Sequence, residues 1–405
     1  MVIVAQLGAR MHYAVPVILQ RAGILERLYT DICAPRRLRP VLNAVARVGP
    51  ASLRRWLGRI PAGVPSEKIV SFNAMAFEYY KRRNAPTPGA LTAANLWAGP
   101  LFCRRVIRCG LGNATSVFTY NGAGLELLRH ARTLGLLTVM EQTIASVEVE
   151  DKLIEVEETD HPEWELPRAK DPFRSAFSQR EQLEWETSDI ILCGSEFVRD
   201  SIRTSGGPVE RCRVVPYGVR LPSSVKLRDR RHTPLRVLTV GAVGLRKGAP
   251  YILEVARALG KKAEFRMAGK LDITSDAQKL LSSHVTLLGG VPRSEIHQQF
   301  EWADVFLLPT LCEGSATVCY EALSYGLPVI TTPNAGSVVR DEIDGFIVPI
   351  RDSAAIVDRI ERILDDSDRW ETMSGNALKR SAEYSLEEYG ERFVSAIQPV
   401  PVMVN

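Results

Sequence analysis

Two glutamates stand eight positions apart in the stretch PTLCEGSATVCYEALSYGLPVITT, which covers residues 309 to 332. Glu313 precedes a run of small residues, whereas Glu321 falls within a segment that has the composition of a helix. A packed core has no use for either carboxylate. Along a helix axis, eight residues span about 12 Å at roughly 1.5 Å per residue. This separation exceeds the roughly 5 to 10 Å between the paired carboxylates of a glycosidase, so we expect the two acids to contact different parts of one long ligand.

The residues between the two glutamates predict a helix over about 315 to 325, which ends at Gly326 as its C-cap. The first N–H groups of a helix have no partner inside it, and small side chains let a diphosphate approach them. The expected ligand contacts at this helix start are Gly314, Ser315, Ala316, Thr317 and Val318. Because an anion would repel it, Glu313 is expected to face sugar hydroxyls or a developing oxocarbenium ion. Glu321 can accept hydrogen bonds from both hydroxyls of a ribose.

The segment GAVGLRKG, residues 241 to 248, follows a predicted strand and places Arg246 next to Lys247 at the start of a helix. Its spacing differs from that of a Walker loop, and no hydroxyl residue follows Lys247. Two adjacent cations, with backbone N–H groups and the helix dipole, favour a phosphate site that includes Gly241. The alternative is a solvated pair of basic residues in a turn.

The elements that must position these residues are visible as short apolar runs, each followed by an amphipathic segment of helical length. Buried parallel strands are predicted near 2–7, 116–120, 136–140 and 189–193, and in a second series near 235–241, 263–269, 284–289, 304–310 and 327–332. The alternation of strand and helix favours the α/β class, with two Rossmann-like, doubly wound domains. We place the first domain at 1–207, a linker at 208–232 and the second domain at 233–385.

The net charge of +4 hides an asymmetry along the chain. Residues 1 to 130 contain eighteen Lys or Arg and only five Asp or Glu, whereas residues 145 to 186 are rich in acids and predict a solvated insertion. The basic, amphipathic stretch 34–60 could contact an anionic membrane, but a solvated face or a groove for an anionic substrate is the commoner case. Nucleic acid is not expected as a partner, because aromatic residues are sparse and no nucleic-acid-binding motif accompanies the charge.

Composition also sets limits on location and metal chemistry. The chain is 45% hydrophobic and 24% charged, and no apolar run reaches the roughly 18 residues that cross a bilayer. It opens on a predicted strand without the pattern of a signal peptide, so we expect a cytoplasmic protein, peripheral at most to the inner face of the membrane. The seven cysteines form no CxxC pair and no zinc-type spacing with the six histidines, and no acidic cluster suits magnesium, so no metal is expected.

The stretch from Glu313 to Glu321, in EGSATVCYEALSYGLPVI, resembles the E-x7-E motif of glycosyltransferase family 4, whose members are retaining enzymes of the GT-B fold. The loop VGAVGLRKG resembles the G-x-KG phosphate loop of that family, and residues 334–352 resemble the segment that follows the motif. The resemblance extends more faintly over 183–220. The first half matches mainly through Gly8, in the loop that faces the donor diphosphate across the cleft in that family.

The resemblance implies a retaining, metal-independent glycosyltransferase that moves a hexose-type sugar from a nucleotide-diphosphate donor to a glycan or lipid-linked acceptor. Cell-surface polysaccharide or glycoconjugate synthesis would be its setting. The two domains would face each other across a cleft, with the acceptor on the first and the nucleotide sugar on the second. A C-terminal helix near 386–400 would cross back to the first domain. No cofactor is implied beyond the donor substrate.

The same resemblance assigns roles to particular residues. Glu313 would contact the transferred sugar near the reacting centre, and Glu321 the ribose. Arg246 and Lys247 would hold the leaving diphosphate, and these two and Glu313 are the predicted catalytic residues. The loop 287–295, which contains Val291, would border the base of the donor.

Two departures from the family pattern affect substrate recognition. Many members have EGFG after the first glutamate, where this chain has EGSA, so the sugar specificity need not be the same. Members often carry a histidine near the acceptor at the end of a strand of the first domain, where this chain has Glu141 followed by Gln142. Glu141 and His12 are the candidate acceptor contacts.

Three other functions stay open at this point. A GT-B-like sugar-nucleotide epimerase would share the cleft and the donor, and a non-catalytic sugar-nucleotide-binding protein would bind the donor without consuming it. A dinucleotide oxidoreductase is suggested by the G-x-G of NGAGLE, residues 121–126, which lacks the third glycine and has only Glu141 near the position of the usual acid.

Overall fold

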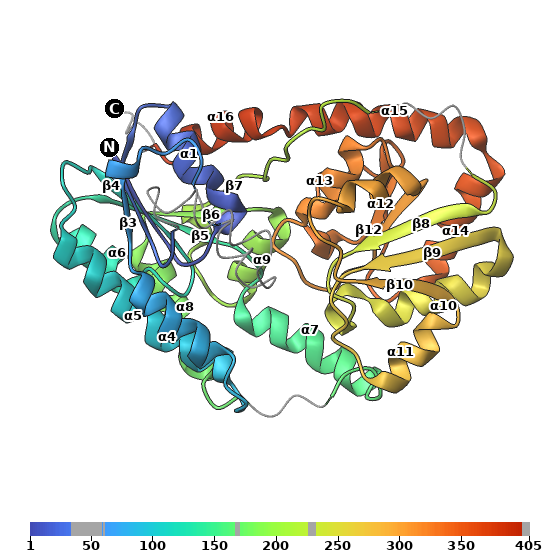
Figure 1. Cartoon of the computed structure of the whole chain (residues 1–405), viewed down its shortest axis with the longest axis horizontal. Coiled ribbons are helices and arrows are strands. Elements are labelled where there is room, and N and C mark those ends of the chain that lie inside the picture. The colour runs from blue at the N-terminus through green and yellow to red at the C-terminus, as the bar shows by residue number, and fades with distance from the viewer. Residues whose placement is uncertain (34–58, 60, 167–170, 226–231, 399–405) are drawn as a thin grey trace, which may run out of the picture.

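The computed structural model describes residues 1–33, 59, 61–166, 171–225 and 232–398, which form two α/β domains (Figure 1). Each domain is built on one fully parallel sheet, so the predicted class of two Rossmann-like domains is confirmed. The predicted membrane-contacting stretch 34–60 lies outside the described residues, apart from Arg59. No helix among the described residues combines the length and the apolar character that a membrane span requires.

The first sheet has seven strands in the order β3-β2-β1-β4-β5-β6-β7. Several strands are buried at every position, as expected for parallel strands that helices cover on both faces. The strands are β1 (Val2–Gln6), β2 (Leu25–Thr30), β3 (Ile69–Ser71), β4 (Ser116–Tyr120), β5 (Leu137–Gln142), β6 (Ile190–Cys193) and β7 (Cys212–Val214). The helices are α1 (Ala14–Arg21), α4 (Asn73–Arg83), α5 (Ala90–Cys109), α6 (Leu125–Thr133), α7 (Val147–Asp160), α8 (Arg174–Thr187) and α9 (Glu196–Thr204).

The second sheet has six strands in the order β10-β9-β8-β11-β12-β13. The strands are β8 (Leu235–Val240), β9 (Ala263–Ala268), β10 (Val285–Gly289), β11 (Val305–Leu308), β12 (Val329–Thr331) and β13 (Gly345–Ile347). The helices are α10 (Ala249–Leu259), α11 (Ser275–Ser282), α12 (Ile296–Trp302), α13 (Thr317–Ser324), α14 (Ser353–Asp365), α15 (Ser367–Glu383) and α16 (Leu386–Ala396).

Both sheets reverse their strand order beside their first strand. β1 lies between β2 and β4, and β8 lies between β9 and β11. The loops that leave the carboxyl ends of such strands diverge, and ligands of open α/β sheets bind in the crevice between them. The candidates Gly8 and His12 follow β1, the loop 241–248 follows β8, and Glu313 follows β11. The topology therefore brings these residues to the switch points of the two sheets.

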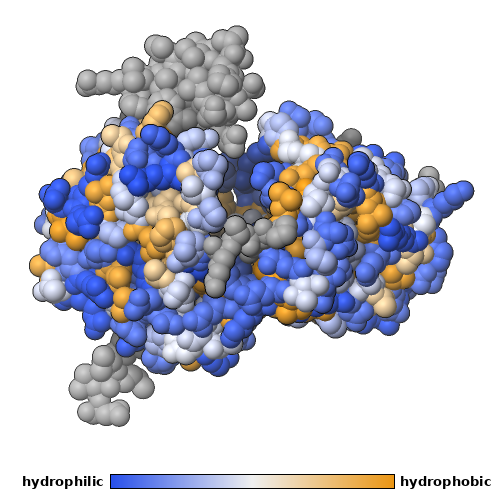
Figure 2. All heavy atoms as spheres, turned by 90° about the horizontal axis from the view of Figure 1, so that it is seen from below, coloured by the Kyte–Doolittle hydropathy of each residue, from blue (hydrophilic) through white to orange (hydrophobic). Residues whose placement is uncertain are grey.

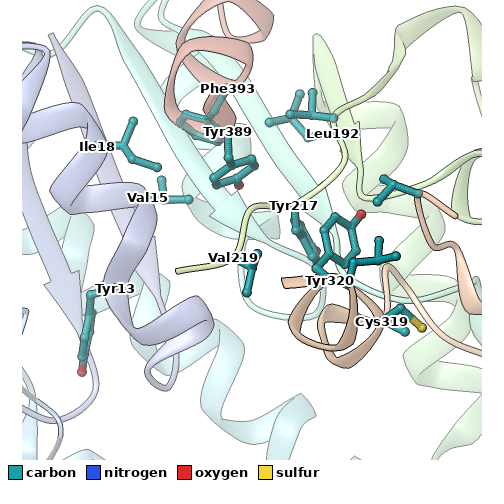
Figure 3. Packing of buried hydrophobic residues seen from close by; sticks show 14 of the residues in the cluster. Tyr13, Val15, Ile18, Leu192, Tyr217, Val219, Cys319, Tyr320, Tyr389 and Phe393 are labelled. Atoms are coloured by element: carbon teal, nitrogen blue, oxygen red, sulfur yellow. The ribbon is translucent and has the colours of Figure 1, made fainter. Parts of the chain in front are cut away.

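The domains are joined by the chain crossover that follows β7 and by the C-terminal helices (Figure 1). Helix α15 packs on α13 of the second domain, and α16 packs on α1 of the first. The N–H of Val219 in the crossover donates to the carbonyl of Tyr384, where α15 gives way to α16. Figure 3 shows the rings of Tyr217, from the crossover, and Tyr389, from α16, in one buried cluster with Tyr320 of α13. The core thus continues from one domain into the other.

The prediction of a solvated insertion over 145–186 is wrong. Glu157 has no exposed surface, and it accepts hydrogen bonds from Tyr251 and Arg351 of the second domain. Trp164 is buried in the core of the second domain. Glu157 is buried because its partners lie on the other domain, which composition cannot reveal, whereas Glu155, Asp160 and Glu163 are exposed. Helix α7 consequently spans the space between the two domains (Figure 1).

Candidate active site

Glu313, Arg246 and Lys247 form one ion cluster at the edge of the second sheet. Oε1 of Glu313 lies 2.7 Å from Nη1 of Arg246 and 2.6 Å from Nζ of Lys247. Lys247 is only 8% exposed, so its ammonium needs a charged partner inside the protein. The carboxylate keeps together two cations that would otherwise repel each other. The structure thus brings the three predicted catalytic residues together, and Glu313 contacts the two cations themselves, a pairing that was not predicted.

Backbone contacts fix the loop that carries the two cations. The carbonyl of Arg246 accepts the N–H of Leu311, and its guanidinium also donates to the carbonyl of Cys312 at 2.7 Å. Gly241, a predicted ligand contact, has φ 145°, and a Cβ at this position would lie 3.1 Å from Cε of Lys247. Glycine therefore makes room for the lysine side chain at this turn.

The segment after Glu313 touches the first domain. A Cβ on Gly314 would lie 1.9 Å from the carbonyl oxygen of Thr143, so only glycine fits there. The carbonyl of Gly314 also accepts the hydroxyl of Ser195, at the start of α9. Gly314 is therefore needed at a close contact between the two domains, which is a structural reason for the residue predicted as a ligand contact.

Helix α13 begins at Thr317 and not at Ser315 as predicted. The hydroxyl of Ser315 is buried and bonded within the second domain. The N–H of Ala316 donates to the carbonyl of Ala335 at 2.9 Å, so it is not available to a ligand in this structure. Thr317 and Val318 are half-buried, and their N–H groups belong to the first turn, which has no partners inside the helix. These two positions keep the predicted role.

Glu321 is separate from the ion cluster and has a different partner. Nη2 of Arg293 lies 3.5 Å from Oε1 of Glu321, and Nη1 of Arg293 contacts Nε2 of His12 in the first domain. Burial raises the pKa of Glu321, and the charge of Arg293 opposes this shift. Burial, followed by the charge of Arg293, lowers the pKa of His12, which favours a neutral ring that accepts from the guanidinium.

Arg293 therefore bridges the cleft from the loop that also contains Val291, the predicted base contact. His12, predicted as an acceptor contact, lies next to Arg293, which also contacts the residue predicted to bind the ribose. The acceptor role of His12 stays a prediction.

The loop after β1 has an unusual backbone. Met11, His12 and Tyr13 have φ values of 44°, 53° and 64°, so three successive residues with side chains are left-handed. This strain persists only because surrounding contacts hold the loop. The N–H of Gly8 donates to Oδ1 of Asp31 at 2.9 Å, and the Tyr13 hydroxyl donates to a carbonyl beyond β2. The Gly8 N–H is thus used inside the protein, and the predicted position of its loop opposite the donor diphosphate stays a prediction.

A cavity of about 340 Å³ lies between the domains and has a volume within the usual range of small-molecule sites. Glu313, Arg246 and Gly314 line it from the second domain, and residues of the first domain form the remainder. Figure 2 shows the molecule hollowed between its two halves. Within the described ranges, no three His, Cys, Asp or Glu side chains gather in a group that could hold a metal ion.

A side chain of helix α8 binds the backbone of the loop after β4. Glu184 has no exposed surface, and its carboxylate accepts the N–H groups of Gly122, Gly124 and Leu125 at 2.6, 2.9 and 3.1 Å. A side-chain anion therefore fills the start of α6, where a dinucleotide would place its pyrophosphate. This contact contradicts the dinucleotide oxidoreductase alternative and explains the G-x-G pattern by local structure.

Two other ionisable side chains of α8, those of Arg180 and Glu181, also bind neighbouring parts of the first domain. Arg180 binds both carboxylate oxygens of Glu126, at 2.9 and 2.8 Å. Glu181 accepts from the side chain of Gln142 at 2.7 Å and from the N–H of Val147 at 3.0 Å, and burial raises its pKa to about 7. Sequence reasoning missed these residues. The spacing of 180, 181 and 184 places them near one another on a helix, but a solvated face has the same pattern.

Glu141 is not among the residues that line the cavity, so the structure does not support its predicted contact with an acceptor. Its Oε1 accepts the hydroxyl of Tyr217 at 2.6 Å, and its Oε2 is buried without a hydrogen-bond partner among the described residues. Burial raises the pKa of Glu141 to about 7, against the opposing effects of the Tyr217 hydrogen bond and the charge of Arg10. Glu141 therefore belongs to the buried joint at the crossover.

Comparison with known proteins identifies the second domain. Residues 226–380 match the family described as glycosyl transferases group 1. The amylovoran biosynthesis glycosyltransferase AmsK of Erwinia amylovora is 29% identical over 186 residues, which are 42% of this chain and 46% of that protein. The chain spans between about half and two thirds of the length of the first curated relatives that it matches.

Solved structures match over the whole chain. Sucrose-phosphate synthase from Thermosynechococcus elongatus is similar with a TM-score of 0.67 and 16% identity, covering 98% of both chains. Anabaena Alr3699/HepE in complex with UDP gives a TM-score of 0.64 and 13% identity, covering 98% of this chain and 99% of that one. At such identities the likeness establishes the fold. Residues 226–380 are therefore similar to the group 1 glycosyl transferases, and the chain that carries them has the GT-B fold.

Proposed function

We propose that the chain is a retaining glycosyltransferase that moves a hexose-type sugar from a nucleotide-diphosphate donor to a glycan or lipid-linked acceptor. The observation that carries the proposal is the ion cluster of Glu313, Arg246 and Lys247, which follows the switch-point strands β8 and β11. Glu313 and Arg246 also line the cavity between the domains. Two cations suit a leaving diphosphate, and one carboxylate suits a sugar carbon that becomes positive.

In the proposed reaction, the bond between the sugar C1 and the diphosphate oxygen breaks while Arg246 and Lys247 stabilise the charge that this oxygen gains. When the donor binds, Arg246 and Lys247 give up their contacts with Glu313 and contact the diphosphate instead. The carboxylate of Glu313 is then free to stabilise the oxocarbenium-like carbon, without forming a lasting covalent bond. The acceptor hydroxyl bonds to C1 on the side that the diphosphate leaves, and its proton passes to a diphosphate oxygen. Because side chains supply the positive charge, the step requires no metal ion.

The remaining parts of the donor are assigned to α13 and its neighbouring loop. The N–H groups of Thr317 and Val318 suit the diphosphate, and Glu321 suits the ribose hydroxyls. Binding of the ribose replaces the 3.5 Å contact between Glu321 and Arg293. The loop that contains Val291 then borders the base.

We place this activity in the cytoplasm, at the inner face of the membrane, in cell-surface polysaccharide or glycoconjugate synthesis. The name of AmsK as an amylovoran biosynthesis glycosyltransferase supports the setting. The excess of cations in residues 1–130 supports a peripheral contact with anionic lipid, for which the stretch 34–60 is the candidate.

The test is to incubate the purified chain with a panel of UDP-, GDP- and ADP-sugars and to analyse the products. A glycosyltransferase releases nucleoside diphosphate from one donor, slowly by hydrolysis and faster with an acceptor present. An epimerase instead yields an altered sugar nucleotide, and a binding protein leaves every donor intact, so either result contradicts the proposal. The anomeric configuration of the product, read by NMR coupling constants, tests the retention.

A further inference from the structure

We infer that the acceptor carries an anionic group, a carboxylate or a phosphate, and that Arg10 binds this group in the cavity between the domains. The inference rests on the proposed function and names the chemical class of its acceptor. Arg10 begins the turn that follows β1, and it lines the cavity together with Tyr120 at the end of β4. Its guanidinium carbon lies 6.0 Å from the centre of the Tyr120 ring.

The charges around the cavity single out Arg10. Three arginines line it, and two of them already have carboxylate partners. Arg174 donates to two neighbouring acids of α7 at 2.8 to 3.0 Å, and Arg246 contacts Glu313. No carboxylate lies within ion-pair distance of Arg10 in the part of the chain that the structure describes, and the sequence 34–60 contains no Asp or Glu. Arg10 thus has no ion-pair partner among the described residues, although its charge acts on the buried Glu141, whose pKa it lowers.

The position of Arg10 favours the acceptor over the donor diphosphate. Lys247 and Arg246 supply the charge for the diphosphate from the second domain, and Arg10 stands on the first. The rings of Tyr79 and Phe177 line the same cavity and offer flat apolar surfaces to a sugar ring. A guanidinium binds a carboxylate or a phosphate through two parallel hydrogen bonds, which would fix the acceptor relative to these rings.

The backbone around Arg10 is consistent with a defined binding position. The three residues that follow it are the left-handed Met11, His12 and Tyr13. Contacts on both sides of Arg10, from Gly8 to Asp31 and from Tyr13 to the chain beyond β2, hold this loop against the first sheet. Strained backbone that its surroundings over-determine is concentrated at ligand sites. Arg10 therefore extends into the cavity from a fixed base.

The experiment compares three probes by titration calorimetry: methyl glucoside, methyl glucuronoside and glucose 1-phosphate. The wild-type chain is expected to bind one anionic probe at least about tenfold more tightly than the neutral one, and the two anionic arms distinguish a uronate from a phosphate. Arg10→Gln is expected to weaken the preferred anionic probe by about 10- to 100-fold, as for loss of a charge-assisted hydrogen bond, and to leave the neutral probe unchanged. Arg10→Lys keeps the positive charge but loses the two parallel donors of the guanidinium. Its affinity for the anionic probe should therefore lie between those of the wild type and Arg10→Gln.

The matched control is Arg21→Gln, which removes one positive charge from the exposed face of α1 and should change no affinity. Equal binding of neutral and anionic probes by the wild type would overturn the inference. So would an Arg10→Gln variant that binds UDP, GDP or ADP more weakly, because Arg10 would then belong to the donor. A donor-hydrolysis assay tells failure of this inference from failure of the proposed function. If the wild type hydrolyses no donor, the glycosyltransferase proposal is contradicted. If the wild type hydrolyses a donor but Arg10→Gln binds the anionic probe as well as the wild type does, only the inference is contradicted.

Discussion

The two switch points of the molecule use their charges in different ways. At the second sheet, Glu313, Arg246 and Lys247 pair with one another beside the cavity, and a ligand can replace their mutual contacts. At the first sheet, Arg180 and Glu184 are buried behind the loops that form the cavity, and they bind those loops. One cluster is suited to chemistry, and the other gives the cavity its shape. Turnover and stability should therefore respond to different substitutions.

The largest effect is expected at the second sheet. Glu313→Gln removes the charge that would stabilise the cationic sugar carbon, so turnover should fall by about 10³-fold, while donor affinity changes little. Steady-state kinetics with the donor found in the panel measure both quantities. Turnover within a factor of about three of the wild type would remove Glu313 from the reaction.

Lys247→Ala sharpens this result, because the lysine is proposed to hold the diphosphate both before and during bond cleavage. This variant should lower donor affinity and turnover together. Lys262→Ala removes an exposed lysine far along the second domain and serves as the control. If Lys247→Ala changed turnover alone, the lysine would act only in the transition state.

At the first sheet, Glu184→Gln should destabilise the fold. Its carboxylate accepts three backbone N–H groups, and an amide in its place turns one acceptor into a donor that faces them. A loss of about 3 kcal/mol in the free energy of unfolding is expected for such a buried group. Chemical denaturation measures it, with the exposed Glu186→Gln as the control. An unchanged stability would show that the loop after β4 does not depend on Glu184.

Glu141, which is buried against Tyr217 of the crossover, should make the stability of the fold depend on pH. The pKa of Glu141 is about 7 in the fold, against 4.5 for an ordinary glutamate, so the folded chain binds more protons between these values. Stability is then highest below the lower value and falls as the pH rises towards and through 7. Glu141→Gln does not titrate, and after the cost of its own buried amide it should gain on the order of 1 kcal/mol over the wild type at pH 8. Thermal unfolding at pH 6 and pH 8 tests this, and a parallel fall in both proteins would contradict it.

The smallest effect is expected from metal removal. Because Arg246 and Lys247 supply the positive charge at the proposed leaving group, chelation with EDTA should leave the rate unchanged. The control is to restore magnesium or manganese after chelation. A rate that fell with EDTA and returned with one of these ions would assign that charge to a metal.

The same contrast explains what the sequence could predict. The site of the second domain lies in two short stretches, and strand-helix periodicity alone places both at one edge of a sheet. The network of the first domain joins residues about 54 to 62 positions apart, such as Arg180 with Glu126 and Glu184 with Gly122. From composition alone, such charged residues are predicted to be solvent-exposed, because composition does not reveal which residues pair with them. The pairing of Glu313 with its two cations depends on side-chain geometry and could not be predicted either.

Helix α7 couples the two regions. Its first turn borders the cavity at Glu150, and the chain beyond its far end inserts Trp164 into the second domain. The next residue, Glu165, accepts the N–H of Leu245 at 2.6 Å, directly before Arg246. A helix of 14 residues is a rod of about 21 Å, and this one is attached at both ends. A rotation of one domain against the other would therefore displace either the wall of the cavity or the loop that carries Arg246.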